Sequence, residues 1–121
     1  KKVVLISNSG SVLYTHNRLA CAAGFSADMF SSPQDAFEAI VSEKPALILC
    51  DLFLTDMTGF DIAREVRQLY DENEVPIVIA TLQKSLDPNE IKKECQNAGV
   101  TEVCEFPPPL ARIKSWVSRA G

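Results

Sequence analysis

The sequence predicts an α/β fold, a single doubly wound five-stranded parallel sheet with five helices. Short apolar segments alternate with amphipathic helical segments along the whole chain. The first, third and fourth strand segments are largely apolar, which is typical of strands that helices cover on both faces of a parallel sheet. The segments between them are long enough for right-handed crossover connections. The third strand segment, residues 46–51, ends on Asp51, at the edge where open α/β sheets bind their ligands.

Local signals justify the first two strands and the first helix. Residues 3–6 form an apolar, fully buried strand, and Ser9, Gly10 and Ser11 then open a helix. Gly24 ends that helix, because glycine readily adopts the left-handed conformation of a helix C-terminus. Residues 25–30 form a weaker, mixed strand that suits a sheet edge. His16 lies among polar residues of the first helix and is expected to be exposed to solvent.

The second helix begins at Ser32 and Pro33, a serine N-cap followed by proline at the first helical position. Its apolar face consists of Ala36, Phe37, Ile40 and Val41. Pro45 ends this helix and leads into the central strand.

The second half of the chain repeats the alternation of helix and strand. A third helix follows Gly59, residues 76–81 form the fourth strand, Asp87 and Pro88 open a fourth helix that Gly99 ends, and residues 103–106 form the fifth strand. The apolar positions of the third helix are Ile62, Ala63, Val66, Leu69 and Tyr70; those of the fourth are Ile91, Cys95 and Ala98; those of the last are Leu110, Ile113, Trp116 and Val117.

Length and composition indicate one ordinary globular domain, residues 1–121. Because the chain begins with lysine and not methionine, two origins stay open, a piece of a longer protein or a trimmed chain. A net charge of −4 argues against direct nucleic-acid binding. No apolar run is long enough to span a membrane, and no leader is present, so a cytoplasmic location is expected. The cysteines Cys21, Cys50, Cys95 and Cys104 form no C-x-x-C pair, and we expect them to be reduced.

Four segments of the chain resemble the receiver domain of two-component response regulators, over nearly its whole length. Residues 51–59, DLFLTDMTG, resemble the phosphoacceptor turn D-x-x-M-P-x-M-x-G, with Thr55 in the place of proline. Residues 76–81 resemble the fourth strand, which ends on a switch threonine, here Thr81. Residues 98–101 resemble the A-G-A turn, and Phe106-Pro107 stands where the family has lysine and proline.

The resemblance implies a flavodoxin-like receiver with strand order 2-1-3-4-5, in which Asp51 accepts a phosphoryl group from a histidine kinase. In the family this reaction needs Mg²⁺, held partly by an acidic pair after the first strand, and a lysine near the end of the fifth strand. Here the acidic pair reads Ser7 and Asn8, and the lysine position reads Phe106. Val103 stands at the aromatic switch position.

These substitutions remove most of the charge that the reaction needs. Mg²⁺ prefers carboxylates and other hard oxygens, so with only Asp51, an Asn8 amide oxygen and the Phe53 backbone carbonyl its binding is expected to be weak or absent. Phosphoryl transfer depends on positioning and on neutralising charge, so phosphorylation is expected to be slow or not to occur. Without acidic neighbours Asp51 should ionise readily unless burial opposes it.

Each of these residues also has a purely structural interpretation. Asp51 is then a polar strand end that accepts hydrogen bonds from nearby backbone amides, and Thr81 is an ordinary β-branched strand residue. Phe106 is expected to fill the core or cover the former phosphate pocket, and the family resemblance implies a cis bond to Pro107. Lys84, three residues after Thr81, is an alternative source of the missing cation.

Three functions stay open at this point. The first is a degenerate receiver, not an enzyme, that works through protein contacts with a histidine kinase or another signalling protein. By analogy with the family, its expected output surface consists of the fourth helix, fifth strand and fifth helix. The family also dimerises through this surface, so a homodimer is possible. The second is a functional Asp51 phosphoacceptor with weak Mg²⁺ binding at Asn8. The third is a flavodoxin-like protein that binds flavin mononucleotide through the loop of residues 7–11.

Overall fold

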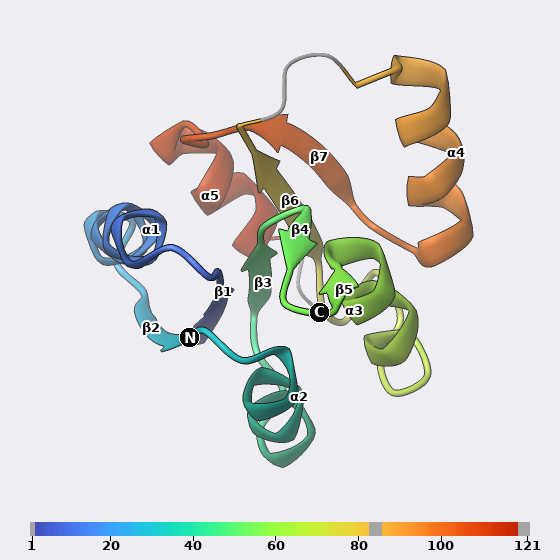
Figure 1. Ribbon diagram of the computed structural model, residues 1–121. Helices are drawn as coiled ribbons and strands as arrows, with labels where there is room; N and C mark the ends of the chain where they lie inside the picture. The colour runs from blue at the N-terminus through green and yellow to red at the C-terminus, as the bar shows by residue number, and fades with distance from the viewer. Residues whose placement is uncertain (1, 83–85, 119–121) are drawn as a thin grey trace.

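Five parallel strands form the central sheet of the molecule, and helices cover both of its faces (Figure 1). The structure is a computed structural model and describes residues 2–82 and 86–118. The strands of the sheet are β1 (Lys2–Ile6), β2 (Ser26–Phe30), β3 (Leu47–Cys50), β6 (Ile77–Thr81) and β7 (Glu102–Glu105). They are arranged in the order β2-β1-β3-β6-β7. Since β6 and β7 are the fourth and fifth strands of this sheet along the chain, the predicted order 2-1-3-4-5 is confirmed.

The helices divide unequally between the two faces of the sheet (Figure 1). The core on one face lies under α1 and α5, and that on the other lies under α2, α3 and α4. The helices are α1 (Gly10–Ala22), α2 (Pro33–Ser42), α3 (Gly59–Val66), α4 (Pro88–Ala98) and α5 (Leu110–Ser118). Strands β3 and β6 are buried at every position, as expected for strands covered on both faces. The mixed strand β2 lies at the sheet edge, as its sequence predicts.

The predicted helix termini are confirmed by their hydrogen bonds and backbone angles. The hydroxyl of Ser32 accepts a hydrogen bond from the Asp35 N–H, and the carboxylate of Asp87 accepts one from the Asn89 N–H. Gly24 and Gly99 both have positive φ angles, at +91° and +77°, just after α1 and at the end of α4. A side chain would be strained at either position.

The segment between Asp51 and α3 is more regular than the sequence predicts. Instead of a loop it forms a short antiparallel hairpin, β4 (Phe53–Leu54) with β5 (Met57–Thr58). The connecting residue Asp56 has a φ of +65°. Strands of two residues show no alternation in sequence, so this hairpin has no detectable periodic signal.

Three predicted apolar positions are exposed. Val41 on α2 is 50% exposed, Leu69 is 46% exposed, and Leu110 at the start of α5 is 37% exposed. Helix α3 ends at Val66, and the chain then turns, so Leu69 no longer lies on the helical face that the spacing assumes. Tyr70 still packs against the core as a partly buried side chain.

Arg67 joins the end of α3 to two neighbouring segments. Its Nε donates to the Gly99 carbonyl at 2.8 Å, and its Nη1 donates to the carbonyls of Tyr70, Asp71 and Val75 at 2.8–3.2 Å. These bonds fix both the α4–β7 turn and the loop into β6. The side chain also limits Gly99, since a Cβ built there would lie 2.8 Å from the Arg67 Cγ.

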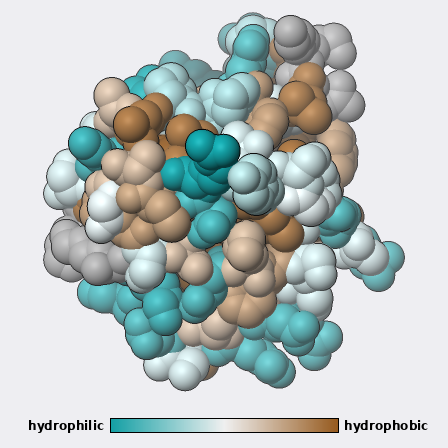
Figure 2. Space-filling model, turned by 90° about the vertical axis from the view of Figure 1, so that its left-hand side faces the viewer, coloured by the Kyte–Doolittle hydropathy of each residue, from teal (hydrophilic) through white to brown (hydrophobic). Residues whose placement is uncertain are grey.

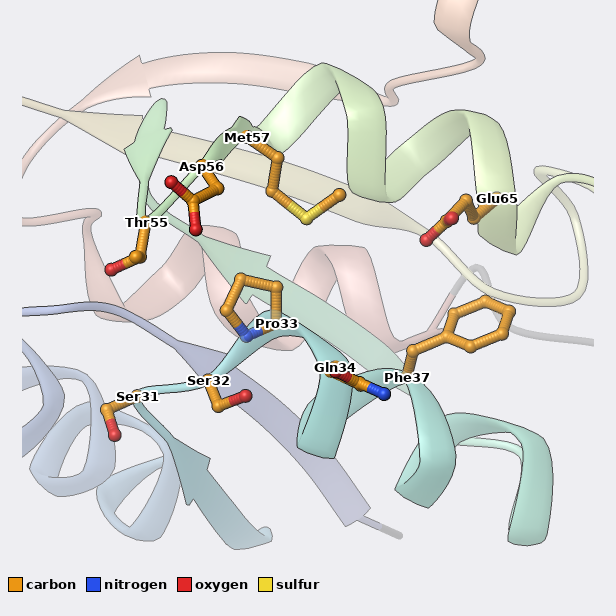
Figure 3. A pocket seen from close by; sticks show the side chains of 9 residues that line it. All are labelled: Ser31, Ser32, Pro33, Gln34, Phe37, Thr55, Asp56, Met57 and Glu65. Carbon is orange, nitrogen blue, oxygen red and sulfur yellow. The ribbon is translucent and has the colours of Figure 1, made fainter.

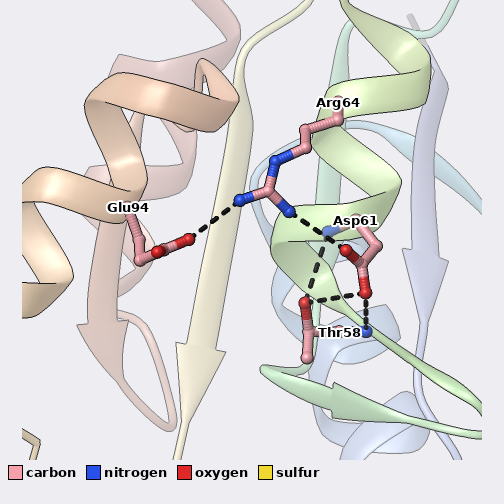
Figure 4. Close-up of polar contacts among 4 residues, drawn as sticks. All are labelled: Thr58, Asp61, Arg64 and Glu94. Atoms are coloured by element: carbon pink, nitrogen blue, oxygen red, sulfur yellow. Dashed lines mark hydrogen bonds and ion pairs between the residues drawn. The ribbon is translucent and has the colours of Figure 1, made fainter.

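The N-terminal half of α3 carries a second polar cluster (Figure 4). The Thr58 hydroxyl accepts from the Asp61 N–H, and the Asp61 carboxylate accepts from the Thr58 N–H, which makes a capping box. Arg64 bridges Asp61 at 3.0 Å and Glu94 of α4 at 2.9 Å. All three charged side chains are exposed by two fifths or more, so this bridge adds little stability.

The side of the molecule where α1 and β2 lie shows no extended apolar area. In Figure 2 the hydrophobic side chains on this face are interspersed with hydrophilic ones. Single exposed apolar residues such as Tyr14 and Met29 are ordinary surface features. Within the described ranges, no helix is both long enough and apolar enough to cross a membrane.

We predict that Arg67→Ala lowers the free energy of unfolding by about 2–4 kcal/mol, because it removes several charged hydrogen bonds from partly buried carbonyls. Urea unfolding followed by circular dichroism measures the change. Arg64→Ala, on the same helix but in an exposed ion pair, is the matched control and should cost no more than about 1 kcal/mol. Equal losses in the two variants would contradict the role given to Arg67.

Candidate functional site

The register of β1 and β3 brings Ser7 and Asp51 together at the carboxyl edge of the sheet. Ile6 lies opposite Cys50, so the next residues of both strands, Ser7 and Asp51, are neighbours. The fully buried Ser7 hydroxyl donates to Asp51 Oδ2 at 2.5 Å and accepts from the Ser9 N–H at 3.0 Å. A short bond of this kind is typical of a hydroxyl paired with a carboxylate. A serine in the first position of the expected acidic pair therefore becomes a hydrogen-bond partner of Asp51.

Burial raises the pKa of Asp51, and the hydrogen bond from Ser7 opposes this by stabilising the ionised form. Burial has the larger effect, so the exception attached to the expectation, that Asp51 ionises readily unless burial opposes it, applies here. The local packing explains the partial burial. Gly59 begins α3 close to the strand end, where a Cβ would lie 2.7 Å from the Asp51 carbonyl oxygen.

Asn8 is bound to two neighbouring segments by its side-chain amide. In the orientation that satisfies its neighbours, the amide NH₂ donates to the Ser31 carbonyl at 3.3 Å and the Thr55 hydroxyl at 3.1 Å, and the amide oxygen accepts from the Thr55 N–H at 3.1 Å. Proline at position 55 would lack that N–H. The two departures from the family pattern, Asn8 and Thr55, are thus direct partners.

Phe106 packs against His16, which is buried and not exposed as the sequence predicted. The two ring centroids lie 5.2 Å apart in an edge-to-face arrangement. His16 has no exposed surface, and neither ring nitrogen has a hydrogen-bond partner among the described residues. Burial lowers the pKa of His16 to about 4, so the ring is neutral near pH 7. Helical spacing from Val12 to His16 and Ala20, all buried, is the signal that places this residue on the inner face.

The remaining predicted site residues lie around Asp51 or on the opposite face of the sheet. Thr81 is buried at the end of β6, and its carbonyl accepts from the Phe106 N–H at 2.9 Å. Phe53 is 59% exposed on β4. Val103 on β7 packs against the core on the side of α2, α3 and α4, away from Phe106. The Phe106–Pro107 bond is cis, as the resemblance implies. Lys84 lies outside the described residues.

A pocket of about 410 Å³ opens directly beside Asp51. Phe53, Thr81 and Phe106 line it together with Ser9 and other residues of the first turn of α1. The sequence-predicted residues Asp51, Phe53, Thr81 and Phe106 are therefore brought together, whereas Asn8 and Val103 do not line this pocket.

A second pocket, of about 570 Å³, lies between α2 and the β4–β5 hairpin (Figure 3). Met57 and Phe37 supply its apolar part, and the carboxylates of Asp56 and Glu65 lie toward its two ends. Neither carboxylate is buried, and Asp51 does not line this pocket. It is separate from the sheet edge at which the family's chemistry takes place.

The pocket beside Asp51 has little charge with which to hold a metal ion or a phosphoryl group. Of its described lining residues only Asp51 is charged. Across the described residues no group of three or more histidine, cysteine or acidic side chains is placed to bind a metal. In the loop after β1, the Ser9 N–H donates to the Ser7 hydroxyl and the Ser9 hydroxyl accepts from the Val12 N–H, so these two groups of Ser9 already have partners within the chain.

Comparison with known proteins gives one consistent result. A family model described as the response regulator receiver domain matches residues 3–113. The aerobic respiration control sensor protein ArcB of Escherichia coli is 29% identical over 96 residues, 79% of this chain, and the regulatory protein LuxO of Vibrio cholerae is 31% identical over 83 residues, 69% of this chain. The matched segments make up 12% and 18% of those proteins.

Solved structures agree on the fold. Chemotaxis protein CheY4 of Vibrio cholerae superposes with a TM-score of 0.82 at 22% identity, over 99% of this chain and 98% of the other. The signal receiver domain of a LuxO repressor protein from Vibrio parahaemolyticus superposes with a TM-score of 0.77 at 25% identity, over 97% and 86% of the two chains.

We predict that Asp51→Asn raises the free energy of unfolding at pH 7, by up to about 1 kcal/mol once solvent screening at this partly buried site is included. Burial raises the Asp51 pKa, so the wild-type fold gains stability as pH falls through that pKa, and the advantage of asparagine should disappear in acid. Urea unfolding at pH 7 and pH 4 measures both parts. A variant less stable than wild type at pH 7 would show that the ionised carboxylate stabilises the fold.

We predict that His16→Leu removes a pH dependence of stability. The folded pKa of about 4 lies below the ordinary 6.5, so the unfolded chain binds the proton first and wild-type stability falls between these pH values, by up to about 3 kcal/mol. The difference in free energy of unfolding between variant and wild type should therefore grow as pH falls from 7 to 4.5. Parallel pH profiles for the two proteins would contradict the burial of a neutral imidazole.

Proposed function

The chain belongs to the response regulator receiver domain family, and from this premise we propose that it is a degenerate receiver. In this proposal it serves a two-component phosphorelay as a signalling module that works through protein contacts and not through metal-dependent phosphorylation of Asp51. The observation that carries the proposal is that Asp51 pairs with the buried Ser7 and borders a pocket with no other charged lining residue among those described.

The chemistry of phosphoryl transfer supports this interpretation. The incoming group carries negative charge that the site must neutralise, and each absent charge contact is expected to cost several kcal/mol in the transition state. Phe106 offers an aromatic ring where the family has a lysine, and His16 behind it is neutral near pH 7. The donors present, one carboxylate and the neutral Asn8 amide already bonded to Thr55, do not fit a magnesium ion. We therefore propose no resident cofactor.

The named relatives support signalling partners. One is a sensor protein and another a luminescence regulatory protein, and in both the matched segment is a small part of the whole. We propose a histidine kinase or another signalling protein as the partner, without nucleic-acid contact by this domain, in the cytoplasm. The four cysteines are all free, which suits a reducing compartment.

We propose the surface of α4, β7 and α5 as the partner-binding face. Of the residues of α4 only Ala98 is buried, and β7 is the outer strand of the sheet with partly buried Val103 and Cys104. An edge strand and a lightly packed helix leave backbone and side chains for a partner or a second copy of the chain.

Of the two alternative functions, the phosphoacceptor remains as an outcome of the test, and the flavin mononucleotide site loses support. A functional phosphoacceptor with weak Mg²⁺ binding would need Asn8 to exchange its bond to Thr55 for the ion. A flavin mononucleotide site is not favoured, because the matches are receivers and the loop after β1 is bonded to Ser7 and Val12.

Phosphodonor labelling tests the proposal. We predict that the wild-type chain treated with acetyl phosphate and Mg²⁺ shows no phosphorylation of Asp51 by mass spectrometry. The triple variant Ser7→Asp, Asn8→Asp, Phe106→Lys restores the three charged groups, and we expect labelling at Asp51 and an Mg²⁺ affinity at least about tenfold higher.

Two further variants make the comparison sharp. Asp51→Ala in the triple-variant background should abolish labelling, and circular dichroism checks that the triple variant folds. Should wild-type Asp51 be labelled, loss of that labelling in Lys84→Ala would identify Lys84 as the alternative cation. Labelling of wild-type Asp51 at a rate comparable with the triple variant would overturn the proposal.

A further inference from the structure

The pocket beside Asp51 has the size and lining of a site for a small organic ligand. Its volume of about 410 Å³ lies within the range of ligand sites in proteins. Val12, Phe53, Leu82 and Phe106 provide apolar surface around it, and serine and threonine hydroxyls complete the lining. Asp51 is the one charged side chain among the described residues that line it.

The carboxylate of Asp51 has one oxygen in use and one available. Oδ2 accepts from Ser7, and no described residue donates to Oδ1. A ligand that brings a positive charge and N–H donors to Oδ1 would stabilise the ionised carboxylate, whereas an anion would be repelled by it. The arrangement therefore favours a cation over the phosphoryl group for which the family's site is built.

The rim of the pocket supplies the second part of the recognition. Two large apolar side chains of this pocket are mostly exposed to solvent: Phe53 at 59% and Leu82 at 68%. Phe106 is partly exposed between them and His16. Covering such surfaces with an apolar ligand body is favourable in proportion to the area removed from water.

We propose that this pocket binds a small amphipathic amine. Its ammonium group donates to Asp51 Oδ1, and its aromatic or branched alkyl body packs against Phe106, Phe53 and Leu82. The inference deepens the proposed function and rests on it in one respect, that Asp51 remains unmodified. Ligand occupancy then serves as the input of a domain that phosphorylation does not switch.

Three matched probes test the proposal on the full chain: phenethylamine, phenethyl alcohol and phenylacetate, which share a body and differ in charge. Titrations followed by ¹H–¹⁵N NMR should give millimolar binding of the amine, at least about tenfold tighter than the alcohol, and no binding of the acid. The amide shifts should gather at residues 9–12, 51–53 and 80–82.

Two variants locate the site. Asp51→Asn should remove the advantage of the amine over the alcohol and leave the alcohol's affinity unchanged. Asp56→Asn removes a carboxylate from the other pocket, between α2 and the β4–β5 hairpin, and should leave all three titrations as in wild type, since asparagine also tolerates the positive φ at that position.

Several outcomes would overturn the inference: equal affinity for amine and alcohol, tighter binding of the acid, no binding of the amine up to its solubility limit, or shifts that gather around Asp56 and Glu65. The proposed function fails separately, by labelling of wild-type Asp51 with acetyl phosphate. The two experiments therefore distinguish a failure of the ligand site from a failure of the degenerate receiver.

Discussion

The parallel pairing of β1 with β3 is the constraint on which the site depends. Both strands are apolar, and side chains on both faces of β3 are completely buried, so a shift in register would expose core residues or bury polar ones. This fixed register leaves Ser7 and Asp51 side by side where the two strands end. The short bond between them follows from the pairing of the strands and needs no separate support from the loops.

The residues that depart from the family pattern contact one another or nearby side chains. Ser7 donates to Asp51, Asn8 pairs with Thr55, and Phe106 packs on His16. In each case the family's charged side chain is replaced by a neutral one: Ser7 contacts the Asp51 carboxylate, whereas Asn8 and Phe106 contact neutral side chains. Because Asp51 remains, the pocket keeps one carboxylate with no charged partner among its described lining residues. Burial disfavours the ionised form of that carboxylate and raises its pKa, and the hydrogen bond from Ser7 partly offsets this effect.

Much of the fold follows from local signals in the sequence. Apolar strand segments, the serine and aspartate N-caps and Gly24 and Gly99 are all where their chemistry predicts. The β4–β5 hairpin and the exposure of Leu69 were not predictable in this way, because strands of two residues carry no period and because the apolar helical spacing continues past Val66, where α3 ends. At the site, the residues that surround Asp51 follow from the family pattern, whereas the direction of its pKa depends on burial, which no pattern of residue types reports.

His16 shows where residue type and helical position disagree. Its polarity indicates the surface, and its spacing from Val12 and Ala20 indicates the core. The spacing prevails because the aromatic ring of Phe106 covers the imidazole, and a lysine at that place would not provide the same apolar contact. The same Phe106 lines the pocket beside Asp51 and bonds through its N–H to the Thr81 carbonyl. One side chain thus borders the pocket, the buried histidine and the end of β6, so an occupant that moves Phe106 changes the packing under α1 and the end of the strand next to β7 at once. Coupling from the pocket to the proposed partner-binding face would require Phe106 to have two packed positions, a condition that depends on apolar contacts and not on a metal.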